Sequence, residues 1–251
     1  MTEEQPVVSV RDVHKSFGRK QVLRGVDLVV RPGETVVVLG GSGSGKSVLL
    51  KHVNGLLRPD RGEVTALGYP VSRRTEAELV GLRRRVSYIF QNSALFDSLT
   101  VGENVAFSLT EGDGLDRTTV AARVGELLAR VGLAGSEGLW PADLSGGMRK
   151  RVAIARGLAL RPEVILYDEP TAGLDPLTGL AISRLIHEVR DETGATSIVV
   201  THDLTLVREL DSRIAFLAAG RFAFMGDLRE AAASPGAVGE FVRAGGVHAG
   251  T

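Results

Sequence analysis

The sequence predicts an α/β protein built on a mostly parallel sheet, and three observations lead to that prediction. Short apolar runs alternate with helical stretches of about 10–15 residues through the second half of the chain, as in strand–helix–strand units. A run of β-branched residues at 35–39 leads directly into a glycine-rich loop and a helix. The chain has 251 residues and is 43% hydrophobic, which is enough for a large core.

The first ninety residues are predicted to form mainly strands. Valine-rich stretches bounded by turn residues indicate strands, and amphipathic stretches follow the glycine-rich loop and a second turn. The strands are expected at 7–13, 22–30, 35–40, within 58–68, and at 86–90. The helices are expected at about 45–54 and at 75–85.

The middle of the chain is predicted to be helical. From Leu99 to Val131, apolar residues fall on one stripe at helical spacing. These residues are Val120, Val124, Leu127, Leu128 and Val131. A further helix is expected from Ser145 to about Leu160, with the Ser145 side-chain oxygen as its cap. The segment of about 92–160 is therefore predicted to form a helical subdomain.

Strands and helices alternate again in the last ninety residues. The strands are expected at 163–168, 196–200, 213–218 and 221–226, with one helix from Pro176 and a short helix after the strand at 196–200. A single domain over residues 7–245 is the resulting prediction. Order is expected to loosen beyond Phe241, and residues 246–251 are expected to form a loose tail.

Composition excludes several classes of protein. Lys and Arg number 30, as do Asp and Glu, so no charge excess indicates nucleic acid or an anionic membrane as the main partner. The absence of cysteine excludes disulfides and thiolate zinc sites. The first residues, MTEEQP, lack the apolar core of a signal peptide, and no apolar run approaches the roughly 18 residues of a membrane-spanning helix.

The stretch GGSGSGKS fits the phosphate-loop pattern GxxxxGK[ST] and lies between a predicted strand and a predicted helix. Main-chain N–H groups of such a loop wrap the β-phosphate of a nucleotide. Lys46 is expected to reach the β- and γ-oxygens, and Ser47 to offer its hydroxyl to Mg²⁺. A flexible Gly/Ser turn is the alternative. The candidate nucleotide-binding residues are Gly40, Gly41, Ser42, Gly43, Ser44, Gly45, Lys46 and Ser47.

Two acids follow the apolar run VILY at 164–167. Asp168, at the end of the predicted strand, is expected to hold Mg²⁺ through water. Glu169 is expected to polarise the attacking water as a general base. A strand that ends in a solvated acidic turn is the alternative, which the phosphate loop upstream makes less favourable.

Gln91, His202 and Phe17 indicate a nucleotide site only in combination. Gln91, at the end of a predicted strand, can touch Mg²⁺ or the lytic water. His202, after the predicted strand at 196–200, can bond the γ-phosphate, and Phe17 can stack on adenine. Each alone is more often an ordinary surface, structural or core residue.

The stretch DLSGGMRKR at 143–151 is an unusual helix start. Two glycines lie in its first turn, where each costs about 1 kcal/mol relative to alanine. Three cations follow, Arg149, Lys150 and Arg151, at the helix end that already carries about half a positive charge. Such a helix start is unfavourable in an isolated chain and suits an approaching anion.

Phe17, the phosphate loop, Gln91, LSGGM, YDEP, AGLD and His202 occur in an order that resembles the ATP-binding-cassette (ABC) family over roughly residues 7–225. The resemblance implies a phosphate-loop NTPase fold with a mostly parallel core sheet, an antiparallel β subdomain and an α-helical subdomain. It implies an ATPase that uses ATP and Mg²⁺.

The family's roles are expected at the matching positions of this chain. Phe17 stacks on adenine, and residues 40–47 hold the phosphates. Ser47, Gln91 and, through water, Asp168 hold Mg²⁺. The remaining expected roles are Glu169 as base, His202 at the γ-phosphate and Asp175 at a dimer interface.

The resemblance also accounts for the helix start. Ser145, Gly146, Gly147 and Met148 are expected to face the nucleotide held by a second copy, in a head-to-tail dimer closed by ATP. The family usually has Gln at position 148, which can complete a capping box with the serine. Met148 cannot, and is expected to pack at the interface or near the ribose. Lys150 and Arg151 are expected to be solvated or to face the helical subdomain.

Three stretches, 90–107, 144–157 and 166–176, look like the ATPase of Mla-type phospholipid transporters, which work with MCE-domain lipid-binding proteins. The implied partners are a polytopic permease, an MCE-domain protein and, in some bacteria, a STAS-domain subunit. The implied location is peripheral, on the cytoplasmic side of the inner membrane. The segment 92–105 is the expected contact with the permease.

Other functions remain open at this point. Another transporter ATPase, for amino acids or lipoproteins, is one alternative. A soluble cassette ATPase, as in iron–sulfur assembly, is another; chromosome-maintenance types need a long coiled-coil insertion, and none fits between Gln91 and Ser145. A nucleotide-gated binding module without turnover is a third alternative, against which Glu169 and His202 argue.

Overall fold

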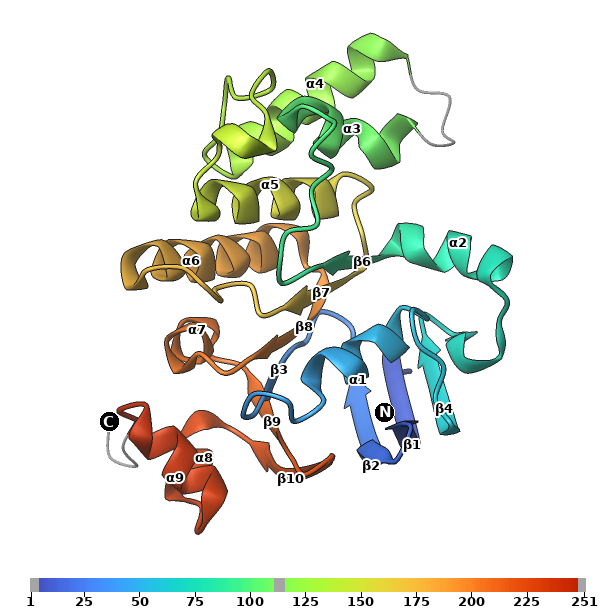
Figure 1. Ribbon diagram of the computed structural model, residues 1–251, viewed down its shortest axis with the longest axis vertical. Helices are drawn as coiled ribbons and strands as arrows, with labels where there is room; N and C mark the ends of the chain where they lie inside the picture. Colours follow the sequence, from blue (N-terminus) through green and yellow to red (C-terminus); the bar gives the residue numbers. More distant parts are fainter. Residues whose placement is uncertain (1–4, 111–115, 248–251) are drawn as a thin grey trace.

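Two sheets and one enclosed helix form the centre of the protein (Figure 1). The computed structural model describes residues 5–110 and 116–247. Helix α1 (Lys46–Val53) packs between the sheets, where its Leu49 and Leu50 share a buried cluster with strands of both. The remaining helices lie mostly on the other face of the larger sheet, over a second buried cluster.

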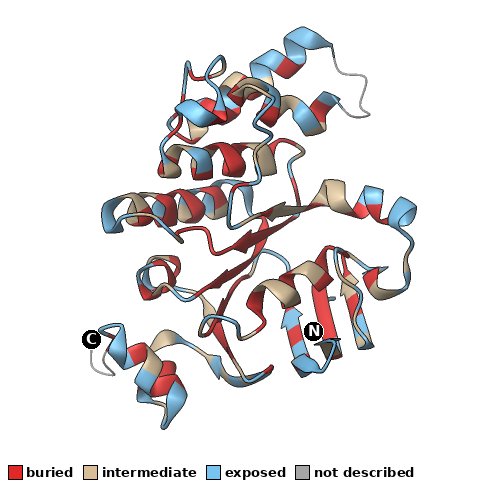
Figure 2. Cartoon of the chain, in the orientation of Figure 1, coloured by how far each residue is buried: buried red, intermediate tan, exposed pale blue. Residues whose placement is uncertain are grey.

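The larger sheet is mostly parallel, as predicted. Its strand order is β10-β9-β3-β8-β7-β6, and of these strands only β10 runs antiparallel to its neighbour, β9. The middle strands are buried on both faces, as Figure 2 shows, which explains their continuous runs of apolar residues. The strands are β3 (Thr35–Leu39), β6 (Val86–Ile89), β7 (Val164–Asp168), β8 (Thr196–Thr201), β9 (Arg213–Ala218) and β10 (Arg221–Gly226).

The smaller sheet is antiparallel, with the order β2-β1-β4-β5. Its inward residues alternate with exposed ones, so one face covers α1 and the other meets solvent. The short strand β5 was not predicted. The strands are β1 (Val8–Phe17), β2 (Lys20–Val30), β4 (Arg61–Ala66) and β5 (Tyr69–Pro70), and a 3-10 turn follows at Val71–Arg73.

Three helices, α3 (Val101–Thr110), α4 (Arg117–Arg130) and α5 (Gly146–Leu158), pack against one another at the top of Figure 1. The predicted helical stretch from Leu99 to Val131 is thus two helices, and residues 111–115 lie outside the described residues. The apolar stripe from Val120 to Val131 is buried. Helix α5 ends two residues before the predicted Leu160, and a second 3-10 turn lies at Pro141–Asp143.

The other helices surround the sheet edges and the outer face. They are α2 (Glu76–Arg85), α6 (Pro176–Thr193), α7 (Leu204–Leu210), α8 (Leu228–Ala233) and α9 (Ala237–Ala244). Among the described helices, none is both long and apolar enough to cross a membrane.

The carboxyl end is more ordered than predicted. Helix α9 continues past Phe241 to Ala244, and both Val242 and Val247 are buried in the cluster on the outer face of the larger sheet. The Phe241 ring packs edge-on against Phe216 of β9. The expectation that order loosens beyond Phe241 is therefore wrong over residues 242–244, and the loose tail at 246–251 stays a prediction. Residues 248–251 of the predicted tail lie outside the described part of the chain.

Candidate active site

The loop between β3 and α1 carries the predicted phosphate site. Gly40 has no room for a side chain, because a Cβ there would lie 2.3 Å from the carbonyl oxygen of Leu217. Gly45 has a φ of 107°, in the left-handed region that favours glycine. The loop wraps the amino end of an eight-residue helix, where free N–H groups and the helix dipole favour an anion.

Lys46 lies inside this loop rather than in solvent. Its Nζ donates to the carbonyl oxygens of Gly40 at 2.9 Å and Gly41 at 3.1 Å. It also forms an ion pair with Glu169 Oε1 at 3.1 Å. The cation is therefore held between the phosphate loop and the second of the two predicted acids.

Asp168, the first acid, uses both carboxylate oxygens. Ser47 Oγ donates to Oδ1 at 2.6 Å, and the Tyr88 hydroxyl donates to Oδ2 at 2.7 Å. Burial, reinforced by the Asp168 charge, raises the pKa of Tyr88, so Tyr88 remains a protonated donor. The contact between Ser47 and Asp168 brings two hard oxygen donors together, and this donor chemistry fits Mg²⁺.

Glu169, the second acid, is fixed by its main chain and by two neighbours. Its φ of 47° is unusual for a residue other than glycine, and such strain costs about 1–3 kcal/mol. Its N–H donates to the Val200 carbonyl oxygen at 2.9 Å. One carboxylate oxygen pairs with Lys46, and the other lies 2.9 Å from His202 Nδ1. The carboxylate is buried and held in one place, as a general base requires.

One cavity of about 440 Å³ brings most of the predicted nucleotide site together. Phe17, which is 49% exposed, lies there, and Lys15 Nζ lies 5.7 Å from the centroid of its ring. The open ring face is suited to stacking. The lining residues are Phe17, Lys20, Val22, Ser42, Gly43, Gly45, Lys46, Ser47, Val48, Gln91, Glu169 and His202.

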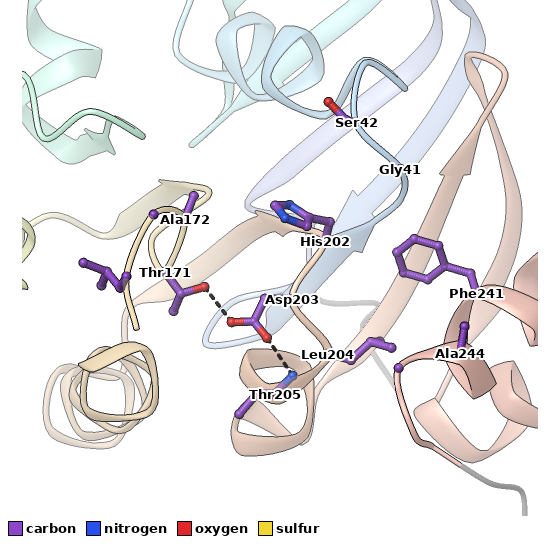
Figure 3. A pocket seen from close by; sticks show the side chains of 13 residues that line it. Gly41, Ser42, Thr171, Ala172, His202, Asp203, Leu204, Thr205, Phe241 and Ala244 are labelled. Atoms are coloured by element: carbon purple, nitrogen blue, oxygen red, sulfur yellow. Dashed lines mark hydrogen bonds between the residues drawn. The ribbon is translucent and has the colours of Figure 1, made fainter. Parts of the chain in front are cut away.

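A second cavity, of about 650 Å³, shares His202 and Ser42 with the first (Figure 3). Asp203 orders its wall by accepting from Thr171 Oγ1 at 2.7 Å and from the N–H of Thr205 at 2.8 Å. His202 therefore lines both cavities and can contact a group bound in either one. The other lining residues are Gly41, Ala172, Gly173, Leu174, Leu204, Phe241, Ala244 and Gly245.

The glycine-containing helix start packs away from the phosphate loop of its own chain. Ser145 caps α5 as predicted, accepting from the N–H of Met148 at 3.2 Å. A Cβ on Gly147 would lie 2.4 Å from Thr178 Cγ2, so the close approach to α6 requires glycine. Among the described residues that line the phosphate-loop cavity, none comes from 144–148.

Asp175 has a structural role that the sequence interpretation missed. It caps α6 by accepting from the N–H groups of Leu177 and Thr178, each at 3.1 Å. Hydrogen bonds from Thr178 are the main cause that holds the pKa of Asp175 below its usual value. Its expected place at a dimer interface stays a prediction.

Lys150 lies where the sequence interpretation did not put it. The expectation that it is solvated or faces the helical subdomain is wrong, because it is 6% exposed and reaches the ends of β6 and β7. Arg151 does face the helices, donating to the Val131 carbonyl oxygen at 2.9 Å. Helical spacing contains a signal for this difference: Lys150 lies three residues from both Gly147 and Ala153, which are buried.

Comparisons with known proteins agree with this geometry. A family model described as "ABC transporter" matches residues 23–172. The chain is 43% identical to the chloroplast protein TRIGALACTOSYLDIACYLGLYCEROL 3 of Arabidopsis thaliana, over 89% of this chain and 69% of the relative. It is 40% identical to a methionine import ATP-binding protein of Mesorhizobium japonicum, over 92% of this chain and 63% of the relative. The chain thus spans about two thirds of the length of these relatives.

A third relative and two solved structures complete the comparison. A sulfate/thiosulfate import ATP-binding protein of Caulobacter vibrioides is 42% identical over 93% of this chain and 70% of its own length. A dimeric ATP-binding cassette in a post-hydrolysis state with ADP and Pi superposes with a TM-score of 0.80, at 34% identity, over 88% of this chain and 98% of that one. Clostridium perfringens cbiO1, part of a transporter complex, gives 0.82 at 31% identity over 92% of both chains.

Proposed function

This chain belongs to the ABC transporter family, and on that premise we propose that it powers the movement of phospholipid through a membrane permease. As a family member it is an ATPase that binds ATP with Mg²⁺. The observation that carries the proposed residue roles is one cavity in which Lys46, Ser47, Glu169 and His202 converge on the phosphate loop.

Ser47, Gln91 and, through water, Asp168 are the residues that would hold Mg²⁺, which supplies neutralisation of the charge on the β- and γ-phosphate oxygens. The Ser47–Asp168 contact at 2.6 Å supports this assignment. Tyr88 holds the other oxygen of Asp168 and so orients the carboxylate. The main-chain N–H groups of residues 40–47 would bind the phosphates, and Phe17 would stack on adenine.

Glu169 would accept a proton from the attacking water as the water oxygen bonds to the γ-phosphorus and the bond to the bridging oxygen breaks. The fixed position of its carboxylate between Lys46 and His202 supports this role. Phosphate oxygens would compete with Glu169 for Lys46, freeing the carboxylate toward the water. His202 uses Nδ1 on Glu169, which leaves Nε2 to meet the γ-phosphate.

A second copy of the chain is the proposed partner for catalysis. Gly146 and Gly147 pack beside Leu174 and Thr178 of their own chain, away from its phosphate-loop cavity. The positive start of α5 would therefore meet ATP held by the other copy. The dimeric cassette with ADP and Pi, similar over 88% of this chain, supports the arrangement.

A groove of about 440 Å³ beside the segment 92–105 is the proposed contact with the permease. Phe96 and Phe107 line it with rings 4.7 Å apart, and Arg156 lies across Phe96. An exposed apolar groove with a basic rim suits a short amphipathic helix. Within the segment 92–105, Phe96 is exposed, whereas Val101 is buried and belongs to the core.

Similarity to one relative supports a lipid as the substrate, and the resemblance to Mla-type ATPases is the reason for proposing phospholipid. The Arabidopsis relative carries the name of a galactolipid, at 43% identity, and three stretches of this chain look like Mla-type ATPases. Importers named for methionine and for sulfate/thiosulfate reach 40% and 42%. The proposed partners are a polytopic permease, an MCE-domain protein and a STAS-domain subunit, and the proposed place is the cytoplasmic side of the inner membrane.

Purification of the tagged chain from its native membranes tests the proposal. We expect a permease and an MCE-domain protein in the complex, and phospholipid among the bound molecules identified by mass spectrometry, above the background of a tag-only purification. A permease that carries methionine, sulfate or a peptide instead would refute the lipid assignment and leave the ATPase intact. Failure to recover any membrane protein would favour a cassette ATPase without a transport role.

A further inference from the structure

Lys150 makes a connection that none of the residue roles above uses. It lies on α5, two residues after Met148, and its side chain is buried. Its Nζ donates to the main-chain carbonyl oxygens of Gln91 and of Glu169, the latter at 3.2 Å. The two acceptors lie at the ends of neighbouring strands, β6 and β7. One side chain therefore joins the helix start to two parts of the active site.

The neighbouring cations on α5 do not make this connection. Arg149 donates to the Leu144 carbonyl oxygen just before α5, and Arg151 donates to the Val131 carbonyl oxygen at the end of α4. Both bonds therefore stay among the helices around α5. Figure 1 shows α5 between α3 and α4 on one side and α6 with the β6 edge of the larger sheet on the other. Of the three, Lys150 alone crosses to the sheet, and it does so between the helices and the nucleotide site.

Burial of this ammonium group is costly, because a buried charge loses its hydration and a neutral side chain would avoid the loss. Burial lowers the pKa of Lys150, against the attraction of Asp168 and Glu169. The two carbonyl acceptors offset part of that loss. The main-chain groups that Lys150 holds in place by hydrogen bonds are therefore the best explanation for its burial.

The hydrogen bonds of Lys150 hold the main chain at Glu169 and at Gln91. The Glu169 peptide lies in the left-handed region, with φ of 47°, and its carbonyl oxygen accepts from Lys150 and from the N–H of Ala172. The Gln91 carbonyl begins the segment that leads to Phe96 and the permease groove. A shift of α5 would thus act directly on the base of the same chain and on this segment.

We propose that Lys150 is a positioning residue for ATP hydrolysis. It keeps the main chain at Glu169 and Gln91 aligned with α5, the helix that would contact the nucleotide of the second copy. The proposal rests on the ATPase function of this chain and not on the identity of the transported substrate. Closure of α5 onto the nucleotide of the second copy would, through Lys150, align Glu169 in its own site. Each hydrolytic site would then depend on the engagement of the other.

Two substitutions separate hydrogen bonding from charge. Lys150→Met keeps an unbranched side chain of similar length and removes the donors, whereas Lys150→Gln keeps two N–H donors without the charge. Arg151→Met is the matched control, because it removes a cation-to-carbonyl bond from the same helix away from the site. Turnover is measured on the full chain with saturating ATP and Mg²⁺, binding with a fluorescent ATP analogue, and folding by thermal melting.

We expect Lys150→Met to lower kcat roughly ten- to a hundredfold, since small displacements of catalytic groups cost up to about 10²-fold. The dissociation constant for the analogue should stay within about twofold, because the phosphate loop is untouched. Lys150→Gln should recover most of the lost turnover. If Lys150→Met does not fold, Lys150→Ala replaces it with the same expected loss, since the smaller side chain leaves space for water.

Other results would overturn the proposal. Turnover of Lys150→Met within twofold of wild type would show that the bonds do not matter for hydrolysis. An equal loss in Arg151→Met would indicate general destabilisation of α5. A Lys150→Gln chain as slow as Lys150→Met would assign the effect to charge. A wild-type chain that hydrolyses ATP but carries no lipid leaves this proposal standing while the lipid assignment fails.

Discussion

At the scale of single residues, the proposed hydrolysis depends on the position of the Glu169 carboxylate. Its peptide has a φ of 47°, and its carboxylate lies between Lys46 and His202. Each contact restricts the position of the carboxylate. Such a group can accept a proton from a water at one defined position, which is the requirement for general-base catalysis.

Replacement of Glu169 by glutamine removes the proposed base and keeps the shape of the side chain. We expect Glu169→Gln to bind ATP as wild type does and to lose turnover by roughly 10²–10⁴-fold, the usual contribution of a positioned base. Phosphate release is the measurement. Glu163→Gln is the control, because Glu163 lies at the other end of β7 in an exposed pair with Arg85. Turnover of Glu169→Gln within threefold of wild type would remove Glu169 from this role.

Removal of the hydroxyl group should have opposite effects on the free energy of unfolding at Tyr88 and at Tyr167. Tyr88 donates to Asp168, whereas the buried hydroxyl of Tyr167 finds no partner among the described residues. A buried hydroxyl without a partner costs about 1–3 kcal/mol. Tyr167→Phe should therefore raise the free energy of unfolding by about 1 kcal/mol, and Tyr88→Phe should lower it by about as much. Urea unfolding measures both, and destabilisation by Tyr167→Phe would contradict the structure.

At the scale of elements, one asparagine on α3 shapes the loop before it. The Asn104 side chain is buried and accepts from the N–H of Phe96 at 2.8 Å. Its amide nitrogen lies within 3.1 Å of the carbonyl oxygens of Phe96, Leu99 and Thr100. Since these bonds satisfy the loop's own main-chain groups, the loop can present the Phe96 ring to the groove without support from the ring itself.

Because the loop is held through its main chain, a charge at Phe96 should disturb docking and spare the fold. We expect Phe96→Asp to bind ATP normally and to lose recovery of the permease from native membranes by at least about tenfold, since a carboxylate does not enter an apolar contact unpaired. Co-purification measures the loss. Met225→Asp on β10 is the matched control, because Met225 and Phe96 are both 43% exposed and Met225 lies outside the groove. Normal recovery with Phe96→Asp would place the permease elsewhere.

At the scale of the whole molecule, the two halves of the proposed catalytic site lie apart. Ser145 begins α5 beside α6, and Lys46 begins α1 between the two sheets. No described residue of 144–148 lines the phosphate-loop cavity. A single chain therefore offers a phosphate loop and a helix start that do not meet, whereas a head-to-tail pair of chains would form two complete sites.

Mixing of two inactive chains tests this arrangement. Ser145→Arg spoils the helix start and Lys46→Ala the phosphate loop, so each homodimer should be inactive. A mixed dimer would keep one intact site. Random pairing should restore roughly a quarter of wild-type turnover without the coupling through Lys150, and about ten- to a hundredfold less with it, which still exceeds the turnover of either mutant alone. A chain with both substitutions is the control, since its mixed dimers with wild type should contain no intact site. Activity of the first mixture no higher than that of either mutant would count against the head-to-tail dimer.

Much of the fold and the active site was predictable because the signals are local. The phosphate loop needs glycines, a lysine and a serine within eight residues of one strand-to-helix turn, and residues 40–47 contain them all. Buried strands and the stripe from Val120 to Val131 follow from periodicity. Residue type and spacing therefore determined the α/β fold, the order of the motifs and the family.

The contacts of Lys150, Tyr88 and Asp175 and the burial of Val247 were decided by the tertiary structure. Lys150 meets two carbonyl oxygens, and every residue has a carbonyl, so residue type cannot identify such an acceptor. Tyr88 and Asp168 lie 80 positions apart and meet only because β6 pairs with β7. Short-range patterns determine which elements form; which faces of those elements pack together is a property of the whole chain, because burial is a long-range, cooperative effect.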